Sequence, residues 1–240
     1  MSLPCHARAA VISLAVLFLP SFSGAAGPVD FAPLPRNWSW VATPPFAAIP
    51  SDPDASPVLL NTPDNTRGRR NLFTAASHGD TVVSVEFMMA KGSNSGVYLM
   101  GRYEVQLFDS FGVESPRFSD CGGIYERWDE STRKGREGRA PALNACLAPG
   151  TWQRLHIDFR APRFNANGAK SENARLVRVV LNGITLHENV ELTGPTRAAA
   201  FSDEQPLGPL MLQGDHGPVA FRNLLLPPPV PAPVIGSQSR

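Results

Sequence analysis

The chain has 240 residues, of which 42% are hydrophobic and 18% are charged, and its formal net charge at pH 7 is +1. The ordinary hydrophobic fraction excludes a disordered chain, and the balanced charge disfavours a nucleic-acid-binding protein, which would carry a basic excess. The 24 prolines and 20 glycines indicate a chain with many turns and disfavour a helical bundle.

The first 26 residues are typical of a secretory signal. Arg8 precedes an apolar run over residues 9–19, Pro20 ends that run, and small residues follow at 23–26. The run is shorter than the roughly 20 residues that a membrane-spanning helix needs. The alternative is an uncleaved anchor. The sequence therefore predicts a secreted or periplasmic protein with no membrane span after cleavage of residues 1–26.

The mature chain is predicted to be one domain over residues 27–226, followed by a proline-rich tail over 227–240. Its first part, 27–71, is expected to be extended with a short edge strand. Asn182-Gly183 is the strongest two-residue hairpin signal. Alternation of apolar and polar residues predicts further strands at 81–89, 95–108, 152–160, 176–181, 184–187, 209–213 and 219–225. This pattern indicates an all-β protein with two stacked antiparallel sheets, a β-sandwich or jelly roll with one polar concave face.

The segment 95–108 is read as one long strand with two different faces. Its apolar face is predicted to lie between the sheets and consists of Val97, Leu99, Tyr103, Val105 and Leu107. Its polar face carries Arg102, Glu104 and Gln106, which are expected to line a groove. A carboxylate between a guanidinium and an amide suits the binding of a polyol, and Glu104 can also act as a general base. The alternative is an exposed sheet face with a surface ion pair.

Four further polar or aromatic residues are candidates for a ligand site. Asp215 and His216 lie between two glycines, and a neighbouring carboxylate orients a histidine and raises its basicity. Arg222 is expected to reach a ligand from its strand, and Tyr125 is expected to stack on a sugar ring. The alternatives are a solvated turn, a surface arginine and an aromatic packed beneath a loop. The charged run 127–139 is read as a solvated loop because acids and bases alternate in it.

Two cysteines remain after removal of the signal, Cys121 and Cys146. In an oxidising compartment an even pair favours a disulfide, and closing this loop stabilises a fold by roughly 3 kcal/mol in the chain-entropy description. The alternative is two buried free thiols.

Several ordered segments resemble the 3-keto-disaccharide hydrolase domain family. They are Asn94–Ser110 (NSGVYLMGRYEVQLFDS), Cys121–Tyr125 (CGGIY), Asn144-Ala145, Pro149–Trp152 (PGTW), Phe159–Phe164 (FRAPRF), Val180–Gly183 (VLNG) and Gly208–Asn223 (GPLMLQGDHGPVAFRN). The resemblance implies a concanavalin A-like jelly roll. It also implies an exported enzyme that cleaves glycosides whose glucose C3 has been oxidised to a ketone.

The chemistry that the resemblance implies needs a base for the C2 proton, an acid for the leaving oxygen and groups that hold the enolate. Glu104 and His216 are the acid and base candidates, and the binding candidates are Arg102, Gln106, Tyr125, Asp215 and Arg222. A divalent cation held by Glu104 or His216 is a further option. The partners would be a carbohydrate substrate and an upstream glycoside 3-oxidoreductase. The other function considered is a non-catalytic carbohydrate-binding or adhesin-like module.

Overall fold

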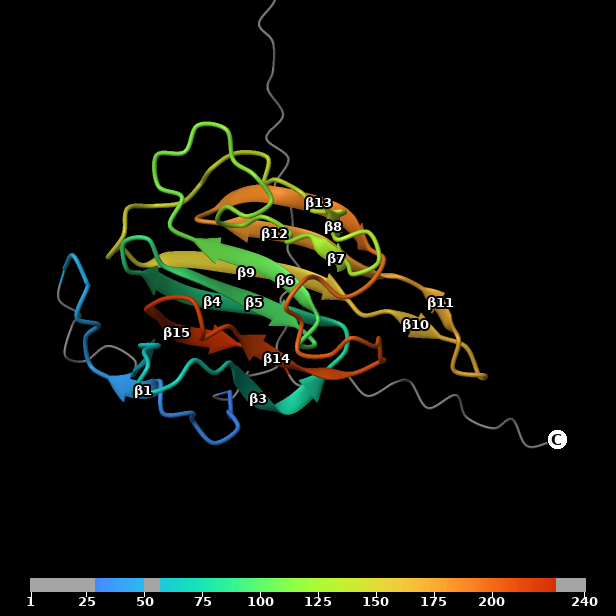
Figure 1. The fold of residues 1–240 in the computed structure, drawn as a ribbon, viewed down its shortest axis with the longest axis horizontal. Coiled ribbons are helices and arrows are strands. Elements are labelled where there is room, and N and C mark those ends of the chain that lie inside the picture. Colours follow the sequence, from blue (N-terminus) through green and yellow to red (C-terminus); the bar gives the residue numbers. More distant parts are fainter. Residues whose placement is uncertain (1–28, 50–56, 228–240) are drawn as a thin grey trace, which may run out of the picture.

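The computed structural model describes residues 29–49 and 57–227, so the predicted signal segment 1–26 and nearly all of the predicted tail lie outside the described residues. The described residues contain β-strands and no helix (Figure 1). In particular, those ranges hold no helix long and apolar enough to cross a membrane.

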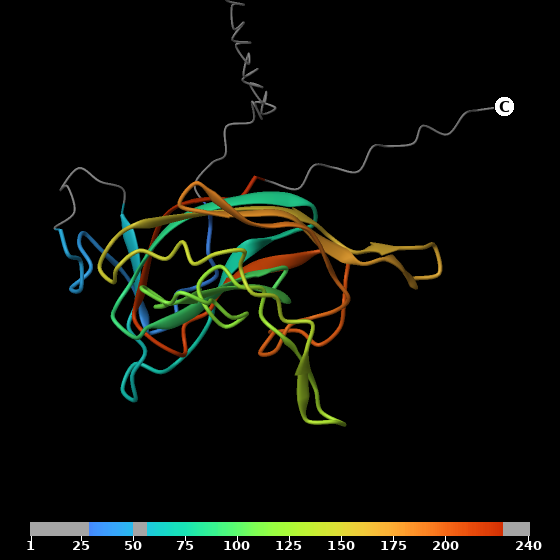
Figure 2. The same cartoon turned by 90° about the horizontal axis from the view of Figure 1, so that it is seen from above.

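Two antiparallel sheets form the body of the molecule, one above the other in Figure 2. The large sheet has seven strands in the order β1 (Trp38–Val41), β2 (Val58–Asn61), β15 (Val219–Leu225), β4 (Thr81–Met89), β9 (Gln153–Arg160), β12 (Ala174–Leu181) and β13 (Ile184–Leu192). The small sheet has four strands in the order β3 (Leu72–His78), β14 (Gly208–Leu212), β5 (Asn94–Leu99) and β6 (Tyr103–Phe108). Two ribbons extend from the body, β7 (Arg127–Asp129) with β8 (Lys134–Arg136) and β10 (Arg163–Phe164) with β11 (Lys170–Glu172). The predicted all-β sandwich of jelly-roll type is confirmed.

The core lies between the two sheets and is built by alternation along the strands. In β4 the inward positions are Val83, Val85 and Phe87, which are completely buried, as are Leu155 and Ile157 of β9. The hairpin of β12 and β13 turns at Asn182 and Gly183, both with positive φ, as the Asn-Gly signal predicted.

The prediction of one long strand over residues 95–108 is wrong, because the chain reverses at Met100 and Gly101. These two residues have φ values of 56° and 65°, and β5 and β6 pair on either side of them. The register opposes Leu99 to Tyr103, so residues of odd number still share one face. The predicted apolar face therefore lies in the core, with Val97, Leu99, Tyr103, Val105 and Leu107 all completely buried.

The charged run 127–139, predicted to be a solvated loop, contains the β7–β8 hairpin instead. The Oδ1 atom of Asp129 accepts hydrogen bonds from the backbone N–H of Ser131 at 2.9 Å and of Thr132 at 3.2 Å. A carboxylate that binds the backbone two and three residues later stabilises a tight turn. The charged residues of this run therefore belong to a hairpin with a defined turn, and the hairpin projects from the body (Figure 2).

The predicted disulfide is not confirmed, because Cys121 and Cys146 are both free, buried thiols in the structure. Their side chains nevertheless interact with each other, and this contact together with burial raises the pKa of Cys121. The even number of cysteines in the mature chain thus correctly predicted that Cys121 and Cys146 lie next to each other. The disulfide itself is not found in the structure.

A buried histidine is expected to make the fold sensitive to acid. His78 accepts a hydrogen bond from the Met100 N–H at Nε2 (3.0 Å), and its Nδ1 lies 3.0 Å from the Gly79 carbonyl oxygen. Burial lowers its pKa from 6.5 to about 4, although the Gly79 carbonyl opposes this shift. The neutral ring therefore holds the turn between β5 and β6 in place.

Between pH 6.5 and 4 the unfolded chain binds a proton at His78 that the folded protein does not. The unfolding free energy is therefore expected to fall by up to about 3 kcal/mol over this range through His78 alone. The measurement is urea unfolding at several pH values, comparing the natural protein with His78→Gln, which keeps a donor and an acceptor. If the difference between the two proteins does not change with pH, His78 does not cause the acid sensitivity.

Candidate functional site

Glu104 of β6 lies on the outer face of the small sheet, and it is buried rather than exposed. It stands opposite Tyr98 of β5 in the register, and only 2% of it is exposed. Segments from elsewhere in the chain cover it, since its N–H donates to the Thr196 hydroxyl at 3.2 Å and its carbonyl accepts from the Tyr125 N–H at 3.3 Å. The predicted open groove along Arg102, Glu104 and Gln106 is therefore a covered site.

The covered position changes the chemistry of the Glu104 carboxyl. Burial raises its pKa from 4.5 to about 8, the hydrogen bond with Tyr98 lowers it, and the negative charge of Asp215 raises it further. At neutral pH the group therefore carries its proton. A neutral carboxylic acid donates a proton readily to a leaving oxygen, which suits a general acid better than a base.

The Glu104 carboxyl occupies the space above Gly96, the residue of β5 that has no side chain to fill it. A Cβ atom placed on Gly96 would lie 2.3 Å from Oε1 of Glu104. A glycine inside a strand often marks such a close approach. Gly96 thus fixes the position of the carboxyl on the sheet.

Two buried amides flank Gly96, one on β6 and one directly after the end of β14. Gln106 opposes Gly96 across the β5–β6 pair, and the Gln213 N–H donates to the Gly96 carbonyl at 2.9 Å. Both side chains are at most 5% exposed, and their Oε1 atoms have no hydrogen-bond partner among the described residues. An unsatisfied buried acceptor costs roughly 1–3 kcal/mol, which a donor such as a sugar hydroxyl would recover.

The turn that carries Asp215 and His216 is seated tightly against the sandwich. A Cβ on Gly214 would lie 2.3 Å from the Arg70 carbonyl oxygen, and one on Gly217 would lie 2.7 Å from the Ser93 hydroxyl. Asn37 and Asn61 donate side-chain hydrogen bonds to the carbonyls of Gly214 (3.0 Å) and Gly217 (3.1 Å) respectively. The turn is therefore held in place before any ligand binds.

Asp215 and His216 form a hydrogen-bonded pair at the surface. Nδ1 of His216 lies 2.5 Å from Oδ1 of Asp215, and 3.5 Å from the amide nitrogen of Gln213. The imidazole is 50% exposed, and the pair lines a pocket of about 450 Å³ together with Arg69. With Nδ1–H donated to the carboxylate, Nε2 keeps its lone pair and can accept a proton.

The structure brings four of the sequence-predicted residues toward Glu104. Gln106 is its neighbour on β6, and the charge of Asp215 acts on its pKa, while His216 is bound to Asp215. Tyr125 is also near Glu104, because burial and the Glu104 charge together raise the pKa of the Tyr125 phenol. The catalytic and binding roles of these residues stay predictions.

Arg102 and Arg222 are not brought to this site. Arg102 follows the β5–β6 turn, and its guanidinium binds the backbone oxygens of Asp203 (2.6 Å) and Met100 (2.9 Å). Arg222 lies on the large sheet beside core residue Phe221 and points away from the core, where it donates to Glu86 at 2.7 Å. Both guanidinium groups are thus engaged elsewhere in the fold.

Among the residues that the structure describes, no three His, Cys, Asp or Glu side chains gather closely enough to hold a metal ion. A divalent cation bound by Glu104 or His216 stays a prediction.

Sequence reasoning missed Gln213, Gly96 and Tyr98. Gln213 directly precedes the glycine-flanked turn, so its place beside His216 could have been inferred from sequence distance. Gly96 carried a signal as well, because an isolated glycine within a strand pattern marks a close approach. The burial of Tyr98 against Glu104 follows from the hairpin that alternation alone did not reveal.

With Glu104 in its predicted catalytic role on a 3-keto-glycoside, replacing Gly96 by alanine is expected to lower kcat/KM by about 100-fold, since a catalytic group displaced by about 1 Å loses roughly this much. The new methyl group would overlap Oε1 of Glu104, which is the end of a flexible side chain, so the strand itself keeps its place. Steady-state kinetics and thermal unfolding measure the two effects. Unchanged kinetics would show that Glu104 does not act from above Gly96.

Residues 47–226 match the family described as the 3-keto-α-glucoside-1,2-lyase-like domain. No significant match was found among curated proteins. Two crystal structures of proteins from Parabacteroides distasonis ATCC 8503, each provisionally named a glycosyl hydrolase, have similar folds.

The first of these structures has a TM-score of 0.55 and 21% identity, with 85% of each chain covered. The second has a TM-score of 0.52 and 17% identity, with 83% of this chain and 93% of the other covered. At such identities the likeness concerns the fold alone, whereas the family match spans most of the chain. The protein therefore belongs to the 3-keto-α-glucoside-1,2-lyase-like domain family and is a carbohydrate-active enzyme by that membership.

Proposed function

We propose that the protein is an exported enzyme that cleaves the glycosidic bond of 3-keto-glycosides such as 3-keto-disaccharides. Family membership supports this substrate class, and the signal-like segment 1–26 supports export. The observation that carries the proposal is a proton-bearing Glu104 within the electrostatic reach of the Asp215–His216 pair. A proton-bearing carboxyl and an imidazole oriented by a carboxylate can serve as acid and base.

His216 is the base in this proposal. The C3 ketone acidifies the hydrogen on C2, and Nε2 of His216 removes it, leaving an enolate. Asp215 accepts the Nδ1–H bond, so it orients the ring and stabilises the imidazolium that forms.

Glu104 is the acid. When the enolate collapses, a C1–C2 double bond forms, the C1–O bond breaks and the aglycone oxygen takes the Glu104 proton. Water then adds at C1 and a proton returns to C2, so that the net reaction is hydrolysis. This route differs from ordinary glycosidases, in which two carboxyl groups flank the scissile bond.

The buried amides of Gln106 and Gln213 are the binding groups of the proposal. Their free Oε1 atoms accept hydrogen bonds from sugar hydroxyls, and Tyr125 offers a half-buried aromatic ring beside Glu104. A reaction that oxidises a glycoside at C3 must supply the substrate, which is the role of a glycoside 3-oxidoreductase.

The test is to incubate the purified protein with a 3-keto-disaccharide and, in parallel, with the unoxidised parent sugar. Release of monosaccharide from the keto form alone supports the proposal. Saturable binding of the keto-sugar without release would instead favour a non-catalytic carbohydrate-binding module, which needs only the amides and Tyr125.

A further inference from the structure

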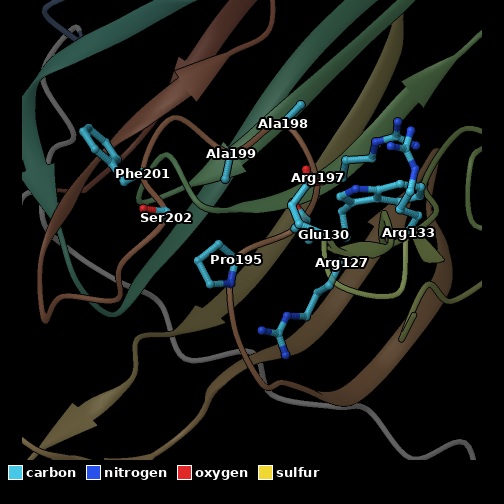
Figure 3. Close-up of a pocket in the computed structure, with 11 residues that line it drawn as sticks. Arg127, Glu130, Arg133, Pro195, Arg197, Ala198, Ala199, Phe201 and Ser202 are labelled. Carbon is cyan, nitrogen blue, oxygen red and sulfur yellow. The ribbon is translucent and has the colours of Figure 1, made fainter. Parts of the chain in front are cut away.

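A second pocket, of about 510 Å³, opens between the β7–β8 hairpin and the loop 195–202 (Figure 3). None of the residues placed in the reaction above lines it. Its charged lining residues are Arg127, Arg133, Arg197 and Glu130. Three guanidinium groups against one carboxylate give the pocket a positive lining.

The positive charge is only partly neutralised by neighbouring acids. Arg127 lies 3.4 Å from Glu137, and Arg197 lies 3.6 Å from Glu126. Arg133 has no ion pair among the described residues. In Figure 3, the side chains of Arg133 and Arg197 lie together at the upper right of the view, whereas that of Arg127 points downward, below Pro195. Arg133 and Arg197 are thus the two arginines best placed to meet one anion.

The Arg197 side chain is held by a neighbouring ring, and the Arg133 backbone is fixed by the hairpin turn. The guanidinium of Arg197 lies over the Trp128 ring, 4.2 Å from its centroid, and the Arg197 N–H donates to the Glu126 carbonyl at 2.7 Å. Arg133 ends the turn that Asp129 caps, and it adopts a positive φ of 53°. A guanidinium stacked as in Arg197 loses little conformational freedom when it binds a planar or tetrahedral anion.

The pocket adjoins the Glu104 site through Thr196. Thr196 lines the pocket, and its hydroxyl accepts the Glu104 N–H bond. Tyr125 is close enough to both regions for their charges to act on its phenol. Burial and the Glu104 charge raise the pKa of Tyr125, whereas the Arg197 charge lowers it. A sugar bound at Glu104 would therefore have its next unit near Arg197.

We propose that this pocket binds an anionic sugar unit, through a carboxylate or a sulfate group held by Arg133 and Arg197. The assignment of that unit as the neighbour of the keto-sugar rests on the proposed function, whereas the anion site itself does not. Guanidinium groups bind carboxylate and sulfate oxygens in pairs of parallel hydrogen bonds, which neutral sugars cannot reproduce.

The test is calorimetric titration of the whole protein with methyl β-D-glucuronide, methyl β-D-glucoside 6-sulfate and methyl β-D-glucoside. At least one anionic glycoside is expected to bind about tenfold more tightly than the neutral one, and the preferred probe identifies the anion. Arg133→Gln and Arg197→Gln are each expected to remove this preference. Arg136→Gln, a matched loss of charge on the same hairpin outside the lining, is expected to keep it.

Equal affinity for all three probes, or an equal loss in Arg136→Gln, would overturn the anion site. Cleavage of a neutral 3-keto-disaccharide without any anion preference would remove the pocket assignment and keep the proposed function. Binding of an anionic probe by a protein that cleaves no keto-sugar would support the anion site and contradict the proposed function. The two ideas therefore fail separately.

Discussion

Replacing Glu104 by glutamine is expected to lower kcat/KM for a 3-keto-glycoside by about a thousandfold, because general acid catalysis contributes on this scale. The same change is expected to stabilise the fold at alkaline pH. The folded protein holds the Glu104 proton up to a pKa of about 8, whereas the unfolded chain releases it near 4.5. Between these values the wild-type protein loses up to about 5 kcal/mol of unfolding free energy that the glutamine variant keeps.

The measurements are kinetics and urea unfolding across this pH range. Wild-type kcat/KM is expected to fall as the pH rises through about 8, where Glu104 loses its proton, and this decline is expected to be absent from the residual activity of the variant. A variant that retains full activity would remove Glu104 from the mechanism. A stability difference that does not grow with pH would contradict its buried, protonated state.

Glu86→Gln is the matched control for this substitution. Glu86 lies on the large sheet, and hydrogen bonds from Arg154 and Arg222 outweigh its partial burial and hold its pKa below the usual range. The folded state therefore prefers the charged form, and the stabilisation is lost as pH falls through the lowered pKa. Its replacement is expected to weaken the fold at neutral pH and to leave activity unchanged.

Replacing His216 by glutamine is expected to lower kcat/KM by about 100-fold or more, since the variant lacks the base for the C2 proton. The imidazole is half-exposed, so thermal unfolding is expected to change little. Asp215→Asn removes the charge that orients the ring and is expected to cost activity with a smaller effect than the loss of the imidazole. Kinetics with a 3-keto-disaccharide measures both.

His156 offers a matched control, because it also pairs with an aspartate. Its Nε2 lies 3.0 Å from Oδ1 of Asp158, on the outward face of the large sheet. His156→Gln is expected to leave kcat/KM unchanged. An equal loss of activity in the two histidine variants would mean that neither ring acts as the base.

Much of the fold could be predicted from local pattern. The strands over 81–89 and 219–225 match β4 and β15, and Asn182-Gly183 forms the expected turn. Alternation also identified the core side of the segment 95–108 despite the reversal within it. The hairpin opposes residues of the same parity, so the two faces stay the same.

The burial of the site could not be predicted, because it depends on contacts between distant parts of the chain. Thr196 and Tyr125 cover Glu104 through backbone hydrogen bonds that no local pattern encodes. Local alternation could not tell which sheet the strand of Arg222 joins, so Arg222 was expected to reach a ligand from its strand. The reversal at Met100 and Gly101 lacked the usual Asn-Gly signal, so Arg102 was placed on a strand face instead of in a turn.

The central claim is that the bond breaks by removal of the C2 proton and not by direct hydrolysis. It is tested most directly by cleaving a 3-keto-disaccharide in deuterated water and following the sugar product by NMR at early times. The proposed mechanism predicts that deuterium appears at C2 as fast as the aglycone is released, faster than in an enzyme-free sample of the product. Release of a product that still carries its original C2 hydrogen would contradict it.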